Sequence, residues 1–284
     1  EFIPSEDKIY TKGVFIDDEY WDRDTHKPTS WEVSGRDVRL ITVDGNKVME
    51  LKDESNVKSV YALRNFKKIA GKDIVLDLVF DSEIETGSAK LNIGNEKGAA
   101  ASIILKSDGV YYADSGSYLK ITSNLGWKGI RVILDTENHT YDIVYGSNKV
   151  SDISFEENID FLDRLVAETD GEMTGNVYMR TVTLFAGYLC NDDFKVYTKN
   201  VLPDGWKREI SGGSVYVANA GGEMTDTRSL LIADTSSNAK VSAVKEFEAT
   251  DDGLTLSFNM LCGDGINISI GDVEICTENG NMYA

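Results

Sequence analysis

Three carboxylates at alternating positions are the residues of this chain whose types and spacing fit acid–base chemistry. Glu168, Asp170 and Glu172 would share one face of a strand, because successive side chains of a strand point to opposite sides. Two carboxyl groups with separated pKa values are what the hydrolysis of a glycosidic bond requires. The intervening Thr169 and Gly171, however, belong to a Gly- and Thr-rich stretch that is typical of a loop. We therefore interpret the acids as loop residues and keep catalysis as an alternative.

A second group of acids, near the start of the chain, has the composition of a site for a hard cation. Asp17, Asp18 and Glu19 are consecutive, and Asp192 and Asp193 stand at the matching place later in the chain. Ca²⁺ takes several carboxylate and carbonyl oxygens as ligands, which such a run can supply. The chain lacks the spaced Asp residues of an EF-hand loop, and a plain acidic turn is the alternative. The sequence thus predicts at most a structural Ca²⁺ as cofactor.

Aromatic side chains are the third group of candidates, because Trp and Tyr rings can stack on the apolar faces of sugars. Tyr111, Tyr112 and Tyr118 flank a short polar loop, and Trp21 lies near the start of the chain. Large rings on a β-sheet are more often buried in packing than offered to a ligand. We take these four residues as the ligand-binding candidates, with packing as the alternative.

The charge of the chain limits the class of partner. Its 284 residues include 29 basic and 48 acidic side chains, which give a formal net charge of −19. Nucleic-acid affinity comes largely from Lys and Arg, so we expect no nucleic-acid partner. Anionic membranes are disfavoured for the same reason. No apolar run approaches the roughly 20 residues that span a bilayer, so we expect no membrane span.

Three cysteines, Cys190, Cys262 and Cys276, have no spacing that fits a zinc site. Their odd number excludes a fully paired disulfide framework. Cys262 and Cys276 lie on segments that the sequence predicts to be neighbouring strands, so a disulfide between them is one alternative. We interpret them as two buried free thiols.

Period-2 alternation of apolar residues dominates the chain and predicts an all-β protein. One segment places four apolar residues on one face, as a half-buried strand does: Ile74, Leu76, Leu78 and Phe80. Further short runs are separated by turn residues every 8 to 12 positions or so, which is typical of an antiparallel β-sandwich of the jelly-roll type. A helical turn is expected only at residues 161–165.

An internal repeat indicates that the chain holds two related domains. Four features of the first part recur in the second in the same order. The matched pairs are Trp31 with Trp206, and residues 51–53 with 232–234, 60–66 with 241–247, and 91–94 with 268–271. The period is far too long for a solenoid, so each copy must be a domain. We expect a tag or linker at 1–9, a complete β-sandwich at 10–190 and about half of a second sandwich at 191–284.

The second copy stops about halfway through the domain. Half a sandwich exposes a sheet face and unpaired strand edges, which costs stability and invites association. We therefore expect the missing strands to come from a partner chain or from the rest of a longer protein.

The repeat also sorts the aromatic residues. Trp31 and Trp206 occupy matched positions, which favours a packing role that the fold requires. Trp21 faces Lys195 in the alignment, and Tyr283 is the one counterpart of the tyrosine group. Because the fold does not need an aromatic ring at these unshared positions, they are the ones to test for binding.

The order of the motifs resembles concanavalin A-like jelly rolls. The motifs are an Asp-Asp-aromatic entry, Leu-x-Asp, Ala-x-(Arg/Lys)-x-Phe, the pair Tyr111 and Tyr112, and residues 126–131 and 135–146. More narrowly, the chain resembles β-sandwich accessory modules that occur in tandem in large secreted bacterial polysaccharide-degrading enzymes. This resemblance implies a secreted or cell-surface location and a structural Ca²⁺ near the entry of the chain into the sandwich. The spacing of residues 168–172 is similar to that of laminarinase-like hydrolases, which carry apolar residues between the acids.

The resemblance favours a non-catalytic carbohydrate-binding or spacer region of an extracellular polysaccharide-active protein, with a polysaccharide or oligosaccharide as partner. One alternative is a glycoside hydrolase or polysaccharide lyase that acts through carboxylates of the sandwich. Another is a protein-binding or adhesive surface module, which a polar acidic surface permits.

Overall fold

The computed structural model describes residues 8–18, 28, 30–43, 45–55, 57–123, 126–146, 148–188, 192, 194, 196–219, 228–235, 240–247, 265–270, 273–278 and 281–283. Every regular element within these residues is a β-strand, so the predicted all-β fold is confirmed. None of the described residues forms a helix long and apolar enough to cross a membrane.

One local prediction is wrong, because residues 161–165 form no helical turn and Leu162–Thr169 is strand β14. The chain divides into two compact units, residues 1–247 and 248–284.

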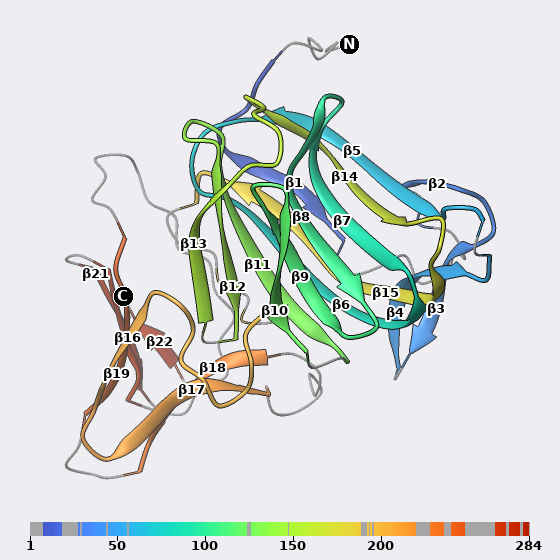
Figure 1. The fold of residues 1–284 in the computed structure, drawn as a ribbon. Coiled ribbons are helices and arrows are strands. Elements are labelled where there is room, and N and C mark those ends of the chain that lie inside the picture. The colour runs from blue at the N-terminus through green and yellow to red at the C-terminus, as the bar shows by residue number, and fades with distance from the viewer. Residues whose placement is uncertain are drawn as a thin grey trace, which may run out of the picture. The chain divides into compact units, whose positions relative to one another are not determined.

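Two antiparallel sheets in unit 1 pack face to face (Figure 1). Among the described strands, one sheet has eight, in the order β13-β12-β11-β6-β15-β4-β3, with β1 also paired to β15. Its strands are β1 (Gly13–Asp17), β3 (Val38–Val43), β4 (Asn46–Asp53), β6 (Ile74–Thr86), β11 (Lys128–Asp135), β12 (Thr140–Tyr145), β13 (Asn148–Ser154) and β15 (Thr174–Ala186). The other described sheet has seven, in the order β10-β9-β8-β7-β14-β5-β2. Besides β14, its strands are β2 (Glu32–Val33), β5 (Tyr61–Ile69), β7 (Ser88–Asn95), β8 (Gly98–Lys106), β9 (Gly109–Asp114) and β10 (Ser117–Thr122).

Alternation of apolar and polar residues builds the core between the two sheets. On β6 the four apolar residues of the predicted face are at most 2% exposed, as expected: Ile74, Leu76, Leu78 and Phe80. Leu91 on β7 of the opposite sheet belongs to the same buried cluster. Removing an apolar side chain of this size from water contributes about 1.5–3 kcal/mol. The shared cluster therefore holds the sheets together and fixes which residues face outward.

Further strands follow the sandwich along the chain. In unit 1, two antiparallel pairs form: β16 (Trp206–Ile210) with β19 (Val241–Lys245), and β17 (Gly213–Asn219) with β18 (Arg228–Asp234). The described part of unit 2 is a three-stranded antiparallel sheet of β20 (Asn267–Ile270), β21 (Val273–Glu278) and β22 (Asn281–Tyr283). Cys276 on β21 is a free thiol, but it is half-buried and not buried as expected. Cys190 and Cys262 lie outside the described residues.

The later strand pairs have the registers expected from the repeat. Glu32 pairs with Leu63 in the first part, and the residues at the equivalent positions, Lys207 and Val244, pair in the second. The antiparallel pairs β17–β18 and β20–β21 stand at the places that the repeat matches with β3–β4 and β7–β8. These registers support the interpretation of residues 191–284 as a partial second copy, which stays a prediction.

The chain after β15 covers part of the outer face of the eight-stranded sheet. Val196, Tyr197 and Val217 form a buried cluster there with Val144 of β12. Gly129 on β11 permits the close approach, because a Cβ at this position would lie 2.3 Å from Cα of Val196. This part of the eight-stranded sheet is therefore closed to ligands.

Candidate functional site

The outer face of the seven-stranded sheet gathers side chains with binding chemistry. Cross-strand partners place one residue per strand in a single row from β5 to β10, and such partners point to the same side of a sheet. The row consists of Tyr61, Glu168, Lys90, Ile104, Tyr111 and Lys120. Its five strand spacings of about 4.8 Å give a length of about 24 Å. We call this row, together with Asn92, Lys106 and Tyr118, the aromatic face.

The candidate tyrosines are divided between the two sides of the sheet. Tyr111 on β9 and Tyr118 on β10 face outward, and Tyr118 is 44% exposed. Tyr112 is 7% exposed and belongs to the core, because neighbours on a strand point to opposite faces. Ile104 faces outward yet is fully buried, so larger neighbouring side chains cover it. Trp21, the fourth ligand-binding candidate, lies outside the described residues.

Three lysines surround the two outward tyrosine rings. Nζ of Lys106 lies 5.3 Å from the ring centre of Tyr111 and 5.7 Å from that of Tyr118. Nζ of Lys90 lies 5.5 Å from the Tyr118 ring centre, and Nζ of Lys120 lies 5.0 Å from the Tyr111 ring centre. Cation–π attraction at such exposed sites contributes about 0.5–1 kcal/mol. A hydrogen bond with Tyr118 raises the pKa of the Lys90 ammonium.

Asp108, in the turn between β8 and β9, binds both Lys120 and Tyr111. Its Oδ2 accepts hydrogen bonds from Nζ of Lys120 at 2.8 Å and from the hydroxyl of Tyr111 at 2.6 Å. These two hydrogen bonds lower the pKa of the Asp108 carboxyl. Lys120 is thus paired with a carboxylate, whereas Lys90 and Lys106 form no ion pair with any carboxylate in the described part of the chain.

The structure separates the three alternating acids. The expectation that all three are loop residues is wrong for Glu168, which lies within strand β14. Glu168 is on the aromatic face and accepts a hydrogen bond from Nδ2 of Asn92 at 2.9 Å. The Asp170 carboxylate accepts hydrogen bonds from Oγ of Ser88 at 2.6 Å and from the backbone N of Glu172 at 3.0 Å. Asp170 therefore closes the turn into β15, and Glu172 is exposed in that turn.

Asn92 has one hydrogen-bonding atom that its neighbours leave unused. Its Nδ2 donates to Glu168, while its Oδ1 is buried and accepts no hydrogen bond from the residues that the structure describes. An unmade hydrogen bond at a buried polar atom costs about 1–3 kcal/mol. A donor at this point of the aromatic face would therefore be stabilising.

The acidic run near the start of the chain contacts its own neighbours. Asp18 accepts a hydrogen bond from Nε1 of Trp31 at 2.9 Å, and Nε of Arg64 lies 3.7 Å from the same carboxylate. Burial raises the pKa of Asp18, although Trp31 and Arg64 act in the opposite direction. Asp17 ends β1, and Glu19 lies outside the described residues. No three His, Cys, Asp or Glu side chains within the described ranges form a group that could hold a metal, and Ca²⁺ stays a prediction.

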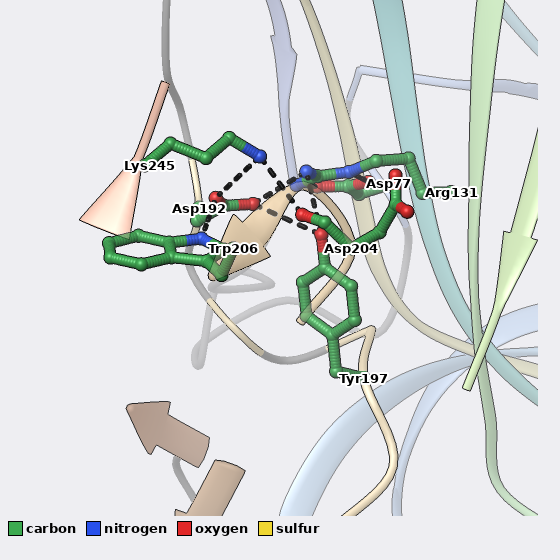
Figure 2. A network of polar contacts seen from close by, with 7 residues as sticks. All are labelled: Asp77, Arg131, Asp192, Tyr197, Asp204, Trp206 and Lys245. Carbon is green, nitrogen blue, oxygen red and sulfur yellow. Dashed lines mark hydrogen bonds and ion pairs between the residues drawn. The ribbon is translucent and has the colours of Figure 1, made fainter. Parts of the chain in front are cut away.

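A matching arrangement in the second part of the chain has more partners (Figure 2). Asp192 accepts a hydrogen bond from Nε1 of Trp206 at 2.7 Å, and its carboxylate lies 3.6 Å from Nζ of Lys245. Trp206 and Lys245 occupy the positions that the repeat matches with Trp31 and Arg64. Both carboxylates are thus engaged by a tryptophan and a basic residue of the chain.

Arg131 on β11 connects this second arrangement to the sandwich (Figure 2). It is 7% exposed, and its Nε and Nη2 each donate to a carboxylate oxygen of Asp77 on β6 at 2.8 Å. Its Nη1 donates to Asp192 at 2.7 Å and to the hydroxyl of Tyr197 at 3.2 Å. Burial alone would lower the pKa of Arg131, but Asp77 raises it above its ordinary value. Burial alone would raise the pKa of Asp192, but Arg131 and Lys245 hold it below its ordinary value.

Sequence reasoning missed the polar members of the aromatic face. Lys90 and Asn92 are the outward positions of an alternating strand, and so are Lys106 and Lys120, which is a usable signal for surface exposure. Their convergence on the tyrosines depends on the pairing of β7, β8, β9 and β10, which alternation alone does not specify.

No protein-family model matches the sequence, and no curated protein matches it. A solved chain described as a sialidase has a TM-score of 0.51 at 12% identity, over 65% of this chain and 19% of that chain. The Emp46p carbohydrate recognition domain in its potassium-bound form gives 0.34 at 15% identity, over 56% and 90% of the two chains. An exo-beta-agarase gives 0.38 at 9% identity, over 64% and 26%. The likeness to the sialidase shows the β-sandwich fold, and this chain spans about a fifth of that protein's length.

Proposed function

We propose that this region binds carbohydrate at the aromatic face without catalysing a reaction, as part of an extracellular polysaccharide-active protein. The observation that carries the proposal is the outward placement of Tyr111 and Tyr118 beside hydrogen-bonding side chains on one face. Tyrosine rings offer apolar surface for a sugar ring, and the amide and ammonium groups around them can bind its hydroxyls. By fold analogy, the likeness to about a fifth of a sialidase chain suits an accessory part of a longer protein.

The row across the sheet suits an extended ligand. A polymer lying across the strands would meet one side chain per strand over about 24 Å, so several weak contacts would add up. Part of the opposite outer face is covered by Val196, Tyr197 and Val217, which favours the aromatic face as the surface for a polysaccharide.

Glycoside hydrolysis or lyase chemistry through Glu168 is the second candidate, because Glu168 lies on the aromatic face. A glycosidase requires two carboxyl groups that flank one bond, and Asp170 is held by Ser88 in the turn. Release of reducing ends by the purified protein, lost in Glu168→Gln, would establish the enzyme. Retention of a polysaccharide without such release would support binding alone.

Tyr118→Ala is expected to weaken the binding of a retained polysaccharide about 10-fold, because a lost aromatic contact removes roughly 1–1.5 kcal/mol. Affinity gel electrophoresis of residues 1–284 over plant, algal and host polysaccharides measures the effect. Tyr188→Ala is the matched control, because Tyr188 is 46% exposed, packs edge-on against Phe185 and follows β15 of the other sheet. If no polysaccharide retards the wild-type protein, the binding proposal fails and a spacer role replaces it.

A further inference from the structure

We propose that the aromatic face selects an acidic glycan, whose carboxylate or sulfate group is bound by Lys90 and Lys106 beside the Tyr118 ring. The inference rests on the proposed function, because it names the class of sugar polymer for the same face. Two observations carry it: the local charge at Tyr118, and the mixture of apolar, cationic and hydrogen-bonding groups around that ring.

Two cationic side chains lie beside one tyrosine ring, although the chain as a whole is acidic. The chain has a net charge of −19, yet the ammonium groups of Lys90 and Lys106 lie 5.5 Å and 5.7 Å from one tyrosine ring. Two ammonium groups placed around the same point repel each other, so the arrangement is stabilised by an anion between or beside them. A carboxylate or sulfate is the sugar substituent that meets this condition.

Lys90 and Lys106 differ from several other lysines of the surface in their ion-pair partners. Lys120, the third lysine of the face, already binds Asp108 at 2.8 Å. Lysines elsewhere on the surface also have carboxylate partners, as in the pairs Lys72–Glu137 at 3.6 Å and Lys207–Glu246 at 2.5 Å. Lys90 and Lys106 form no such ion pair with a described residue. Neither ammonium group is therefore bound directly by a described carboxylate, although Glu156 and Glu168 act on Lys90 electrostatically.

The acids near Lys90 define the side from which the anion approaches. Glu156 and Glu168 both act electrostatically on Lys90. Glu168 is its cross-strand partner on β14, whereas Tyr118 reaches Lys90 from β10 on the other side. Glu156 accepts a hydrogen bond from Oγ of Ser102, which stands four residues before Lys106 on β8. An acidic group is thus favoured near Lys106, at the end of β8 away from Ser102.

The remaining groups at this place fit a sugar rather than a simple anion. The exposed Tyr118 ring offers apolar surface, and the buried Oδ1 of Asn92 lacks a donor among the described residues. A sugar acid supplies a negative group, an apolar ring face and hydroxyl donors within one unit. Free phosphate or sulfate supplies only the first of these.

Matched polymers test the choice of sugar directly. Residues 1–284 are run in affinity gels that contain polygalacturonate, its fully methyl-esterified form, dextran sulfate or dextran, so that each acidic polymer has a neutral partner with the same backbone. We expect retardation by an acidic polymer and at least 10-fold weaker retardation by its neutral partner. Polygalacturonate and dextran sulfate distinguish carboxylate from sulfate as the bound group.

Charge-removing variants test the two lysines. The double variant Lys90→Gln, Lys106→Gln is expected to bind the retained acidic polymer at least 10-fold more weakly. The double variant Lys72→Gln, Lys207→Gln removes the same number of charges from paired surface lysines and is expected to bind as the wild type does. Raising the ionic strength from about 0.1 M to about 1 M shortens the Debye length from about 10 Å to about 3 Å, so binding should weaken with salt.

Each outcome separates this inference from the proposed function. Equal retention of the esterified and acidic polymers would overturn the choice of an acidic glycan but keep carbohydrate binding. The same conclusion would follow if the two double variants bound equally well. If no neutral or acidic polysaccharide is retained at any ionic strength, carbohydrate binding itself fails.

Discussion

The variant Arg131→Ala is expected to lose about 3–5 kcal/mol of the free energy of unfolding, because breaking a buried ion pair leaves an uncompensated charge. Arg131 is 7% exposed and donates to both Asp77 and Asp192, whose side chains are 2% and 3% exposed. The substitution would leave these two carboxylates facing each other without the cation between them. Urea unfolding followed by tryptophan fluorescence measures the loss, since Trp206 donates to Asp192.

An exposed ion pair provides the control for Arg131→Ala. Lys207 and Glu246 are 66% and 68% exposed, and such surface pairs contribute about 0–1 kcal/mol. Lys207→Ala should therefore leave the unfolding free energy nearly unchanged. Arg131→Lys should have an intermediate effect, because it keeps the charge but cannot bind Asp77 through two parallel hydrogen bonds. An Arg131→Ala loss as small as that of Lys207→Ala would contradict a stabilising role for the network.

The network also explains how the chain after the sandwich is held. Asp77 belongs to β6 of the sandwich, whereas Asp192 belongs to the segment that follows β15. Arg131 joins the two by hydrogen bonds, and the adjacent cluster around Val196 and Tyr197 adds apolar burial. Polar groups fix the position of the segment, since a buried charge without its partner is strongly unfavourable.

Strands with strict alternation could be predicted from the sequence. The inward face of β6, from Ile74 to Phe80, follows from local spacing, because a period of two needs no knowledge of the partner strand. The error at residues 161–165 has a physical cause in β14. Its pairing with β5 is irregular between Leu162 and Arg164, and such a bulge lets Leu162 and Leu165 both face the core at a spacing of three. That spacing is typical of a helix, so the local pattern was misleading.

The candidate site was predictable only in part. Alternation implies that one residue of the Tyr111 and Tyr112 pair faces inward, but the sequence does not say which. The contacts of Arg131 could not be predicted from local spacing, because its partners Asp77 and Asp192 are 54 and 61 positions away. Such contacts depend on the order of strands in the sheet and on where the following segment packs.

Asp192→Asn is expected to lower the free energy of unfolding by about 3 kcal/mol at pH 7, because the carboxylate is a buried partner of Arg131 and Lys245. The pKa of Asp192 lies below its ordinary value in the folded protein. Its stabilisation is therefore complete above the unfolded pKa of about 3.9 and is lost as the pH falls through the folded pKa. The wild type and Asp192→Asn should differ most near neutral pH and converge in acid.

Asp18→Asn is the matched control, because Asp18 accepts a hydrogen bond from the corresponding tryptophan but has Arg64 as its one guanidinium neighbour among the described residues. Burial raises the pKa of Asp18, so its contribution is complete below the unfolded pKa and is lost as the pH rises through the folded pKa. Asp18→Asn should therefore cost less at pH 7 than at pH 3, the reverse of Asp192→Asn. Urea unfolding of both variants between pH 3 and 7 measures the two trends. If both variants showed the same pH dependence of the unfolding free energy, Arg131 would not be what holds Asp192 in its ionised form.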